Sequence, residues 1–259
     1  MKTKLTLVLI SILGLIYSCK KKDDVKIDLN KNLVAYYPFS GNANDESGNS
    51  NNGTVYDATL SMDRFGNNNS AYYFNGSSSY IDCGNNPLLK RSLTDFSICF
   101  WINPSSYSEG TTFAILSNRC NQADGSISGS MVDMPGPNYQ GFDSASVVEK
   151  RIRLTLRGGI YATFIYSDSK VELDKWTFVT VCYQYNGSNQ NVGTIYLNGV
   201  KQVEKTMNDI PDAGSTPTYI GFEPYGVSPL YHFHGFIDDV RIYNKVISNE
   251  EINALFKLQ

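Results

Sequence analysis

Short strand-like segments separated by polar turns run along the chain from Leu33 onward, and this pattern constrains the fold most strongly. The candidate strands are Leu33–Phe39, Ala71–Phe74, Tyr80–Cys83, Phe96–Asn103, Thr112–Leu116, Ile152–Leu156, Ile160–Tyr166, Trp176–Tyr185, Gly193–Leu197, Lys201–Lys205, Thr218–Phe222 and Phe233–Tyr243. No helical periodicity separates them, and regularly spaced short strands are typical of antiparallel sandwiches. We therefore predict an all-β fold of two antiparallel sheets.

Two Asn-Gly pairs and one capping motif add local detail. Asn198-Gly199 and Asn75-Gly76 each follow a strand-like run, and Asn-Gly is a strong signal for a tight hairpin turn. Ser248 and Glu251 form a capping box, and Ile252, Leu255 and Phe256 follow at helical spacing. We expect one short C-terminal helix that packs against the sandwich.

The segment Pro104–Lys150 is the longest irregular stretch, interrupted by short runs such as Phe113–Leu116. Long loops in compact domains are often functional. Neither an internal repeat nor a composition break marks a second domain, so we expect one domain over residues 32–259.

The N-terminus predicts export and anchoring. Leu5–Tyr17 is apolar, follows two lysines and is too short to span a bilayer, which is typical of a signal peptide. Ser18-Cys19 resembles a bacterial lipobox, which implies a signal peptide over 1–18, lipidation of Cys19 and a tether over 19–31. Lys20–Asp24 resembles the signal that sends some lipoproteins to the outer face of the outer membrane. The alternative is an ordinary secretory signal followed by a solvated charge run.

Composition excludes some partners and leaves the thiol chemistry open. The formal net charge is −3, so the chain lacks the basic excess of nucleic-acid-binding proteins. Besides Cys19 there are four cysteines, at 83, 99, 120 and 182, which could be free buried thiols or form one or two disulfides. The 18 tyrosines suit β-strands and also suit sugar-binding surfaces.

Three sequence blocks together resemble one family. They are Leu33–Asn49 with Asn52-Gly53-Thr54, then Phe96–Ile102 with Trp176–Val179 and Tyr196–Gly199, and finally Gly235–Asn244 with Ser248 and Glu251-Ile252. The chain resembles a laminin-G-like domain of the concanavalin A-like lectin/glucanase superfamily over about residues 33–257. The resemblance implies a two-sheet jelly roll with a curved front sheet. Its members include sugar-binding, protein-binding, adhesive and accessory modules, so the fold leaves the function open.

One carboxylate suggests a metal. Strict alternation along 236–242 would place Asp238 on the same face as Phe236, Val240 and Ile242, where a buried acid needs a cation or several donors. Asp45 lies in the oxygen-rich loop 42–52, which also offers the carbonyls of Gly48 and Asn49. Calcium prefers such oxygen ligands, and the superfamily often binds one calcium between an N-terminal loop and the penultimate strand. We therefore predict a structural Ca²⁺ site. The alternatives are that Asp238 pairs with an arginine or caps backbone amides, and that the loop consists of turns only.

No catalytic motif is present. The eight glutamates never form the E-x-D-x-(x)-E pattern of the superfamily's glucanases, in which alternate carboxylates face one sugar. We therefore predict a non-catalytic cell-surface module that binds carbohydrate. The alternatives are a protein-binding or adhesive lipoprotein, and a glycoside hydrolase or its accessory protein. The aromatic candidates for ligand contact are Tyr107, Tyr139, Phe142, Tyr225 and Tyr231.

Overall fold

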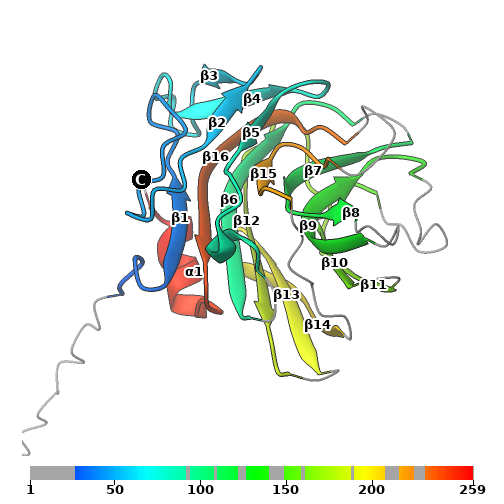
Figure 1. The fold of residues 1–259 in the computed structure, drawn as a ribbon. Helices are drawn as coiled ribbons and strands as arrows, with labels where there is room; N and C mark the ends of the chain where they lie inside the picture. The colour runs from blue at the N-terminus through cyan, green and yellow to red at the C-terminus, as the bar shows by residue number, and fades with distance from the viewer. Residues whose placement is uncertain are drawn as a thin grey trace, which may run out of the picture.

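The computed structural model has two eight-stranded antiparallel sheets packed face to face (Figure 1). It describes residues 27–91, 94–107, 110–121, 127–139, 149–158, 161–187, 190–207, 216–224 and 231–258. This architecture confirms the predicted all-β jelly-roll sandwich. Within the described ranges, no helix combines the length and apolarity that a membrane span requires.

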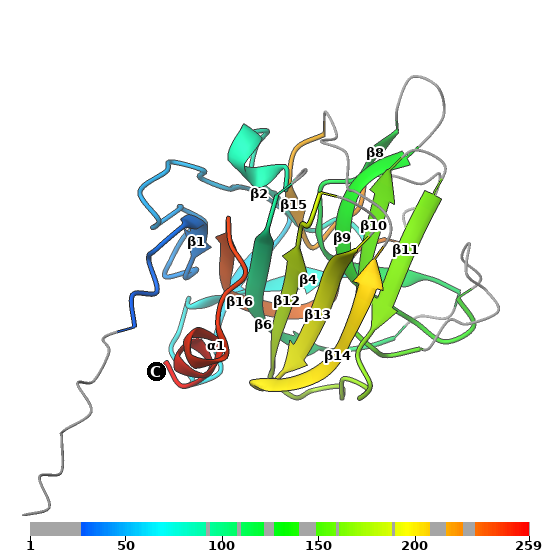
Figure 2. The same cartoon turned by 90° about the horizontal axis from the view of Figure 1, so that it is seen from below.

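The back sheet carries the C-terminal helix on its outer face (Figure 2). Its strands, in spatial order, are β14 (Val200–Met207), β13 (Asn191–Leu197), β12 (Thr177–Gln184), β6 (Phe96–Pro104), β16 (His234–Tyr243), β4 (Ala71–Asn75) and β3 (Thr59–Ser61), while β1 (Leu33–Tyr37) also pairs with β16. The strand β16 therefore holds β4 along its first half and β1 along its second half.

The front sheet covers the opposite side of the core. Its strands, in spatial order, are β11 (Tyr161–Tyr166), β10 (Arg153–Gly158), β9 (Ile127–Pro135), β7 (Thr112–Ser117), β15 (Tyr219–Ile220), β5 (Tyr80–Asp82) and β2 (Thr54–Tyr56), while β8 (Cys120–Asn121) pairs with β9. A 3-10 turn, η1 (Pro87–Leu89), follows β5.

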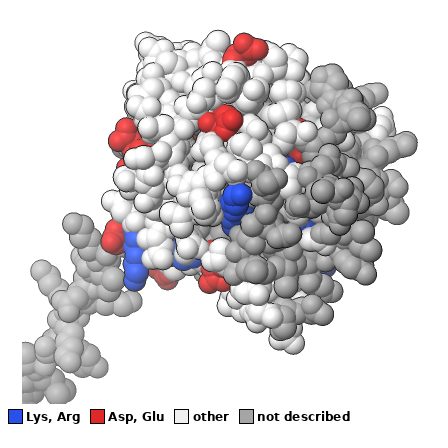
Figure 3. All heavy atoms as spheres, viewed as in Figure 1, with Lys and Arg blue, Asp and Glu red and all other residues white. Residues whose placement is uncertain are grey.

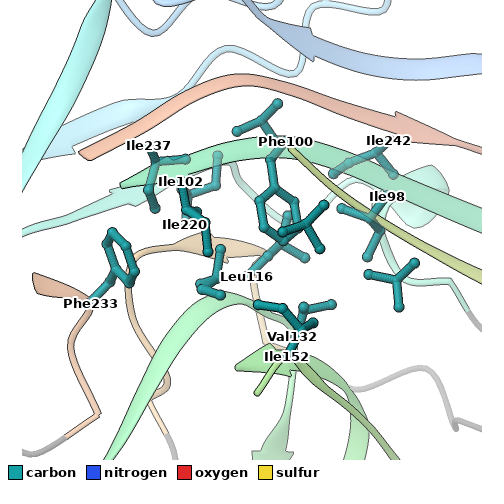
Figure 4. Packing of buried hydrophobic residues seen from close by; sticks show 14 of the residues in the cluster. Ile98, Phe100, Ile102, Leu116, Val132, Ile152, Ile220, Phe233, Ile237 and Ile242 are labelled. Atoms are coloured by element: carbon teal, nitrogen blue, oxygen red, sulfur yellow. The ribbon is translucent and has the colours of Figure 1, made fainter. Parts of the chain in front are cut away.

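Apolar side chains from both sheets fill the space between them (Figure 4). Ile98, Phe100 and Ile102 alternate along β6 and are fully buried, and they face Leu116 and Val132 of the front sheet. Each strand thus uses its period-2 alternation to place one face in the core. Because the core takes one face of each sheet, the opposite face carries other groups, such as α1 on the back sheet.

The predicted helix is present as α1 (Asn249–Phe256). The Ser248 hydroxyl accepts from the Glu251 amide, and the Glu251 carboxylate accepts from the Ser248 amide, which completes the capping box. Ile252 and Leu255 are fully buried in a second apolar cluster that includes Trp101. The helix therefore closes the outer face of the back sheet, as the spacing predicted.

The two Asn-Gly turns have different outcomes. Asn198 and Gly199 both have positive φ, and they connect the paired strands β13 and β14 as predicted. The hairpin predicted at Asn75-Gly76 is wrong, because β4 belongs to the back sheet and β5 to the front sheet. The Asn75 side chain instead accepts from the amides of three following serines, which turns the chain between the sheets.

The segment Pro104–Lys150 is more ordered than its composition predicted. It contains β7, β8 and the nine-residue strand β9, whose described residues 127–135 are all buried. The sequence ISGSMVDMP lacks a simple alternation of apolar and polar residues because both faces of β9 are covered. The interpretation of 104–150 as mainly irregular was therefore wrong at its centre.

Two further details concern the cysteines and the N-terminal tether. All four cysteines besides Cys19 are buried thiols outside any disulfide, and burial raises the pKa of Cys182 to about 11. The described chain begins at Ile27, inside the predicted tether, and Leu29 already packs beside α1. The Tyr243 hydroxyl donates to the Leu29 carbonyl over 2.9 Å, so the end of the predicted tether is attached to the domain.

Candidate binding face

The outer face of the front sheet, called the front face below, gathers polar and aromatic side chains from many strands. Residues directly opposite each other in neighbouring strands share a face. One such row crosses the sheet through Phe164, Thr155, Met131, Ser117, Tyr219 and Asp82. A parallel row runs through Tyr166, Arg153 and Asp133. The register therefore assembles one face from residues up to 137 positions apart.

An ion pair dominates one half of the front face. The Arg153 Nε donates to Asp133 Oδ1 over 2.9 Å, and its Nη2 donates to Asp133 Oδ2, so the pair is bidentate. The Thr112 hydroxyl also donates to Asp133. Burial alone would lower the pKa of Arg153, but the charge and hydrogen bonds of Asp133, together with the nearby Tyr166 and Tyr139, outweigh burial and hold that pKa well above its ordinary value. Arg153 is thus charged, and its bonds to Asp133 fix the pair.

Aromatic rings surround this pair. The Arg153 guanidinium lies 5.2 Å from the ring centroid of Tyr139, 5.4 Å from that of Phe164 and 5.9 Å from that of Tyr166. Stacking of a guanidinium on aromatic rings is attractive. The half of the front face around Arg153 is therefore a rigid assembly of charge and rings, called the charged half below.

A second buried acid lies nearby. The Ser117 hydroxyl donates to Glu223, and the Arg119 guanidinium lies 3.8 Å from the same carboxylate oxygen. Burial and then the neighbouring Tyr139 raise the pKa of Tyr231, which also interacts with Arg119 and Glu223. The tyrosines 139 and 231 are thus brought together above the charged half.

The other half of the front face carries a series of touching rings, called the aromatic half below. Tyr56 and Tyr80 stack at 4.5 Å and 15°. Tyr80 also contacts Tyr219 and Phe222, and Phe222 stacks on His232 at 4.6 Å. Tyr56 is 44% exposed, and the other three large rings are half-buried. The aromatic half therefore offers flat ring faces to solvent beside the polar groups.

The predicted ligand residues divide into three groups. Tyr139 and Tyr231 lie on the front face, as described above. Tyr107 packs against the core and donates to the Val171 carbonyl over 2.6 Å, so its hydroxyl is used inside the fold. Phe142, Tyr225 and the lipidation candidate Cys19 lie outside the described residues.

Sequence reasoning missed most of the front face. Neither the Asp133–Arg153 pair nor the rings of Tyr56, Tyr80 and Tyr219 stood out in the sequence, since each belongs to a separate strand. The alternation of apolar and polar residues in 153–157 could have pointed to Arg153, because Arg, Thr and Arg alternate there with two leucines. Its partner could not be identified while β9 was unrecognised.

Of the predicted calcium ligands, Asp45 organises its own loop. Its Oδ1 accepts from the amides of Tyr36 and Ser47, and its Oδ2 accepts from the amide of Asn51, each over 2.9 Å. The Asn49 side chain donates to the Leu33 and Val34 carbonyls, while Gly48 provides a positive-φ turn. The loop is thus bonded to one edge of β1.

Asp238 lies elsewhere, and its predicted face is wrong. The register of β16 against β6 shifts between Asp238 and Arg241, and Asp239 has a φ of 56°. This bulge adds a residue, so Ile237 and Val240 both enter the core while Asp238 points to the outer face. The shared face with Val240 and Ile242 does not exist because strict alternation fails at the bulge.

The Asp238 carboxylate is paired with arginine. Arg64 Nη1 lies 2.5 Å from Asp238, its Nη2 lies 3.1 Å from Asp239, and Arg241 lies 2.9 Å from Asp239. Burial, followed by the neighbouring Asp239, raises the pKa of Asp238 from 3.8 to about 7, although Arg64 opposes the change. An arginine partner, the alternative in the sequence interpretation, is what the structure contains.

These contacts do not fit the predicted calcium site. Strand β1 lies between the Asp45 loop and β16, since the loop bonds to Tyr36 on one edge and β16 pairs on the other. Asp45 is occupied by backbone amides and Asp238 by a guanidinium. Across the described ranges, no group of three or more His, Cys, Asp or Glu side chains is placed to hold a metal ion. Calcium remains a prediction from the sequence that these contacts do not support.

The comparison with protein families decides the classification. A laminin-G-type family model, described as the concanavalin A-like lectin/glucanases superfamily, matches residues 74–253. The chain belongs to this superfamily. The match includes most of both sheets and the start of α1. No curated protein matches the chain.

Solved structures share the fold of this superfamily member. Domain 4 of AbnA, an extracellular arabinanase from Geobacillus stearothermophilus, in complex with arabinotriose, is 19% identical with a TM-score of 0.64, covering 87% of this chain and 98% of that domain. The binding domain of Paraclostridial Mosquitocidal Protein 1 is 20% identical with a TM-score of 0.66, covering 88% of this chain and 52% of that one. A botulinum neurotoxin type C structure, whose cell entry depends on two ganglioside molecules, is 18% identical with a TM-score of 0.62, covering 88% and 51%.

At 17–20% identity, these structural similarities establish the fold alone. The chain spans about half the length of the toxin structures that it matches. Domain 4 of AbnA is in complex with arabinotriose, and the toxin structures are binding domains. The ligand of this chain does not follow from the shared fold.

Proposed function

We propose that the chain is a non-catalytic module that binds carbohydrate on the front face. The observation that carries this proposal is the aromatic half, where stacked rings with exposed faces adjoin hydrogen-bonding groups. Sugar rings pack their C–H faces on aromatic rings while polar side chains bond their hydroxyls. Thr155, in the row that leads to Tyr219, has a buried hydroxyl with no hydrogen-bond partner among the described residues. The arabinotriose-bound neighbour supports the same class of ligand.

Two buried acids on the front face, Asp133 and Glu223, favour binding over hydrolysis. Both oxygens of Asp133 accept from Arg153, and Glu223 accepts from Ser117 beside Arg119. A glycosidase needs one carboxyl group to donate a proton and another to attack or to activate water. Carboxylates held in ion pairs are poorly suited to that exchange, so we propose recognition without cleavage.

The decisive experiment removes the aromatic half. Tyr56→Ala and Tyr80→Ala should each weaken retention on a bound polysaccharide by roughly tenfold, equivalent to about 1.4 kcal/mol. Tyr196→Ala, which removes a half-buried ring from the back sheet, is the matched control. Retention and new reducing ends are measured together on a panel of polysaccharides.

The outcomes separate the alternatives. Equal loss in Tyr196→Ala would move the site away from the front face. Reducing ends that disappear with a single Asp or Glu substitution would favour the hydrolase. No retention on any glycan, with a protein partner found by cross-linking on cells, would favour the adhesive alternative.

We further propose that Cys19 anchors the chain by lipid to the outer membrane, with the domain facing the exterior. The lipobox-like Ser18-Cys19 and the following Lys/Asp run support this proposal. Cys19→Ala should release the chain from membranes. Replacing Lys21–Asp24 by alanine should leave it anchored but protected from external protease, and unchanged protease access would contradict surface exposure.

A further inference from the structure

A pocket of about 530 Å³ opens on the outer side of the back sheet, away from the front face. It lies where the loop after β3 and the end of α1 meet the back sheet. Its lining residues are Arg64, Phe65, Trp101, Trp176, Phe256, Lys257 and Leu258. The chain has two tryptophans, and both line this pocket. The volume falls within the range of small-molecule sites, about 300–1,000 Å³.

The wall of the pocket is aromatic and fixed. Trp101 stacks on Phe256 at 5.7 Å and 21°, and the Arg64 guanidinium lies 4.7 Å from the Trp101 ring and 4.4 Å from the Phe65 ring. Phe65 is 50% exposed. Since Arg64 is held by Asp238 and Asp239, the rings around it are pre-organised. The half-exposed ring of Phe65 and the half-buried rings of Trp176 and Phe256 offer apolar surface to a sugar ring.

The loop that supplies Arg64 and Phe65 is ordered by its own sequence. The Asp63 carboxylate accepts from the amides of Phe65 and Asn67, each over 2.8 Å, and from the Asn67 side chain. Arg64 also donates to the Leu258 carbonyl over 3.3 Å, which joins the loop to the end of α1. The pocket is therefore built between two segments that bond to each other.

The charged side chains that line the pocket favour one class of ligand. The lining residues include two cations and no carboxylate. Arg64 is neutralised by the two aspartates behind it, whereas the exposed Lys257 ammonium has no ion-pair partner within the described ranges. An apolar wall with an exposed cation complements a ring that bears an anion.

We propose that this pocket is a second carbohydrate site, for a sugar ring that carries a carboxylate, of the uronic acid class. The apolar face of the ring packs on the aromatic wall, and the carboxylate meets Lys257. The site is separate from the front face, and its existence does not depend on carbohydrate binding there. Two sites on opposite sides would let one chain bridge two glycan segments.

Tryptophan fluorescence tests the proposal directly, because both reporters lie in the pocket and none lies on the front face. The purified full-length chain is titrated with trigalacturonate and, separately, with neutral galactotriose. We expect a saturable change in tryptophan emission with trigalacturonate and an apparent affinity at least about tenfold weaker for the neutral sugar. No change in emission up to about 10 mM trigalacturonate would overturn the proposal.

Three variants sharpen the test. Lys257→Ala, an exposed position that should leave the fold intact, is expected to remove the preference for the acidic sugar, and a retained preference would overturn the carboxylate contact. Trp176→Ala should abolish the response, with Trp101 still reporting. Tyr80→Ala should leave the response unchanged; if it abolished the response, the signal would originate at the front face and the second site would be refuted. Loss of front-face binding alone leaves this inference standing.

Discussion

Arg153 on the front sheet and Arg64 beside the back sheet are both buried and paired with aspartates, but the two pairs are positioned by different parts of the fold. Arg153 on the front face pairs with one acid from the directly opposite residue of the neighbouring strand. Arg64 on the back side extends from a loop to two adjacent acids on a bulge, more than 170 residues away in sequence. Both guanidinium groups lie against aromatic rings. The difference is that one pair is set by strand register, and the other joins separate parts of the fold.

The acids also differ in their electrostatics. Asp133 faces a single arginine and a hydroxyl, and it holds Arg153 firmly charged. Burial, followed by the second carboxylate beside it, raises the pKa of Asp238 to about 7. Arg153 therefore stays charged, while the charge on Asp238 beside Arg64 changes near neutrality. A like charge beside a buried acid weakens the stabilisation that the paired cation gives to its charged form.

The largest expected effect comes from breaking the Arg153 pair. Arg153→Met leaves the Asp133 carboxylate buried without its cation and should reduce the free energy of unfolding by about 3–5 kcal/mol. The double variant Arg153→Met/Asp133→Leu should regain most of this loss, because it removes the uncompensated charge. Urea denaturation of wild type and both variants measures the effect. A single variant that loses less than about 1 kcal/mol would show that Asp133 has another source of stabilisation.

The next largest effect on stability depends on pH and arises from the titration of Asp238. A carboxyl group whose pKa is higher in the folded than in the unfolded state binds its proton more tightly when folded. Its contribution to stability is complete below about pH 4 and is lost as the pH rises to about 7, amounting to roughly 2–4 kcal/mol. Asp238→Asn should remove this component.

The measurement compares urea denaturation of wild type and Asp238→Asn between pH 4 and pH 8. The difference between the two stability curves should grow as the pH rises and flatten above the titration of Asp238. Curves that run parallel throughout would show that Asp238 does not titrate in this range. Asp239→Asn sharpens the test, since removing the neighbouring charge should lower the pH at which the difference levels off.

A smaller effect on stability is expected from removing an aromatic ring beside each of the two arginines. Tyr139→Leu should cost about 1 kcal/mol through loss of the ring over Arg153, whereas Phe65→Leu should cost less because Phe65 is half exposed. Thermal denaturation at one pH ranks the two variants. The reverse order would mean that the ring over Arg64 contributes more than its exposure suggests.

The smallest expected effect concerns metal removal. Because Asp45 and Asp238 are occupied by amides and by Arg64, EDTA should change the Tm by less than about 1 °C, or roughly 0.3 kcal/mol. A larger fall that CaCl₂ reverses would support the calcium site predicted from the sequence. Asp45→Asn in the same assay would then show whether that loop holds the ion.

Local features of the sequence were sufficient for the elements whose stabilising contacts are close in the chain. The capping box at Ser248 predicts α1, since its two bonds span three residues. Asn198-Gly199 predicts a hairpin because both residues tolerate positive φ. Alternation in Phe96–Asn103 predicts a central strand, and the observed β6 extends it by one residue. The class of fold follows from such elements added together.

Tertiary structure decided everything that depends on long-range pairing. The bulge at Asp239 reverses the expected face of Asp238, and only the register against β6 makes it visible. Asn75-Gly76 satisfies the local rule for a hairpin, yet it connects two sheets because β4 and β5 find other partners. The front face and the pocket lined by Trp101 and Trp176 are likewise assembled from segments that are distant in the sequence. Sequence by itself determined which segments become strands, helix and turns, because those choices depend on neighbouring residues. Which side chains meet was decided by packing and strand register, which arise only when the whole chain folds.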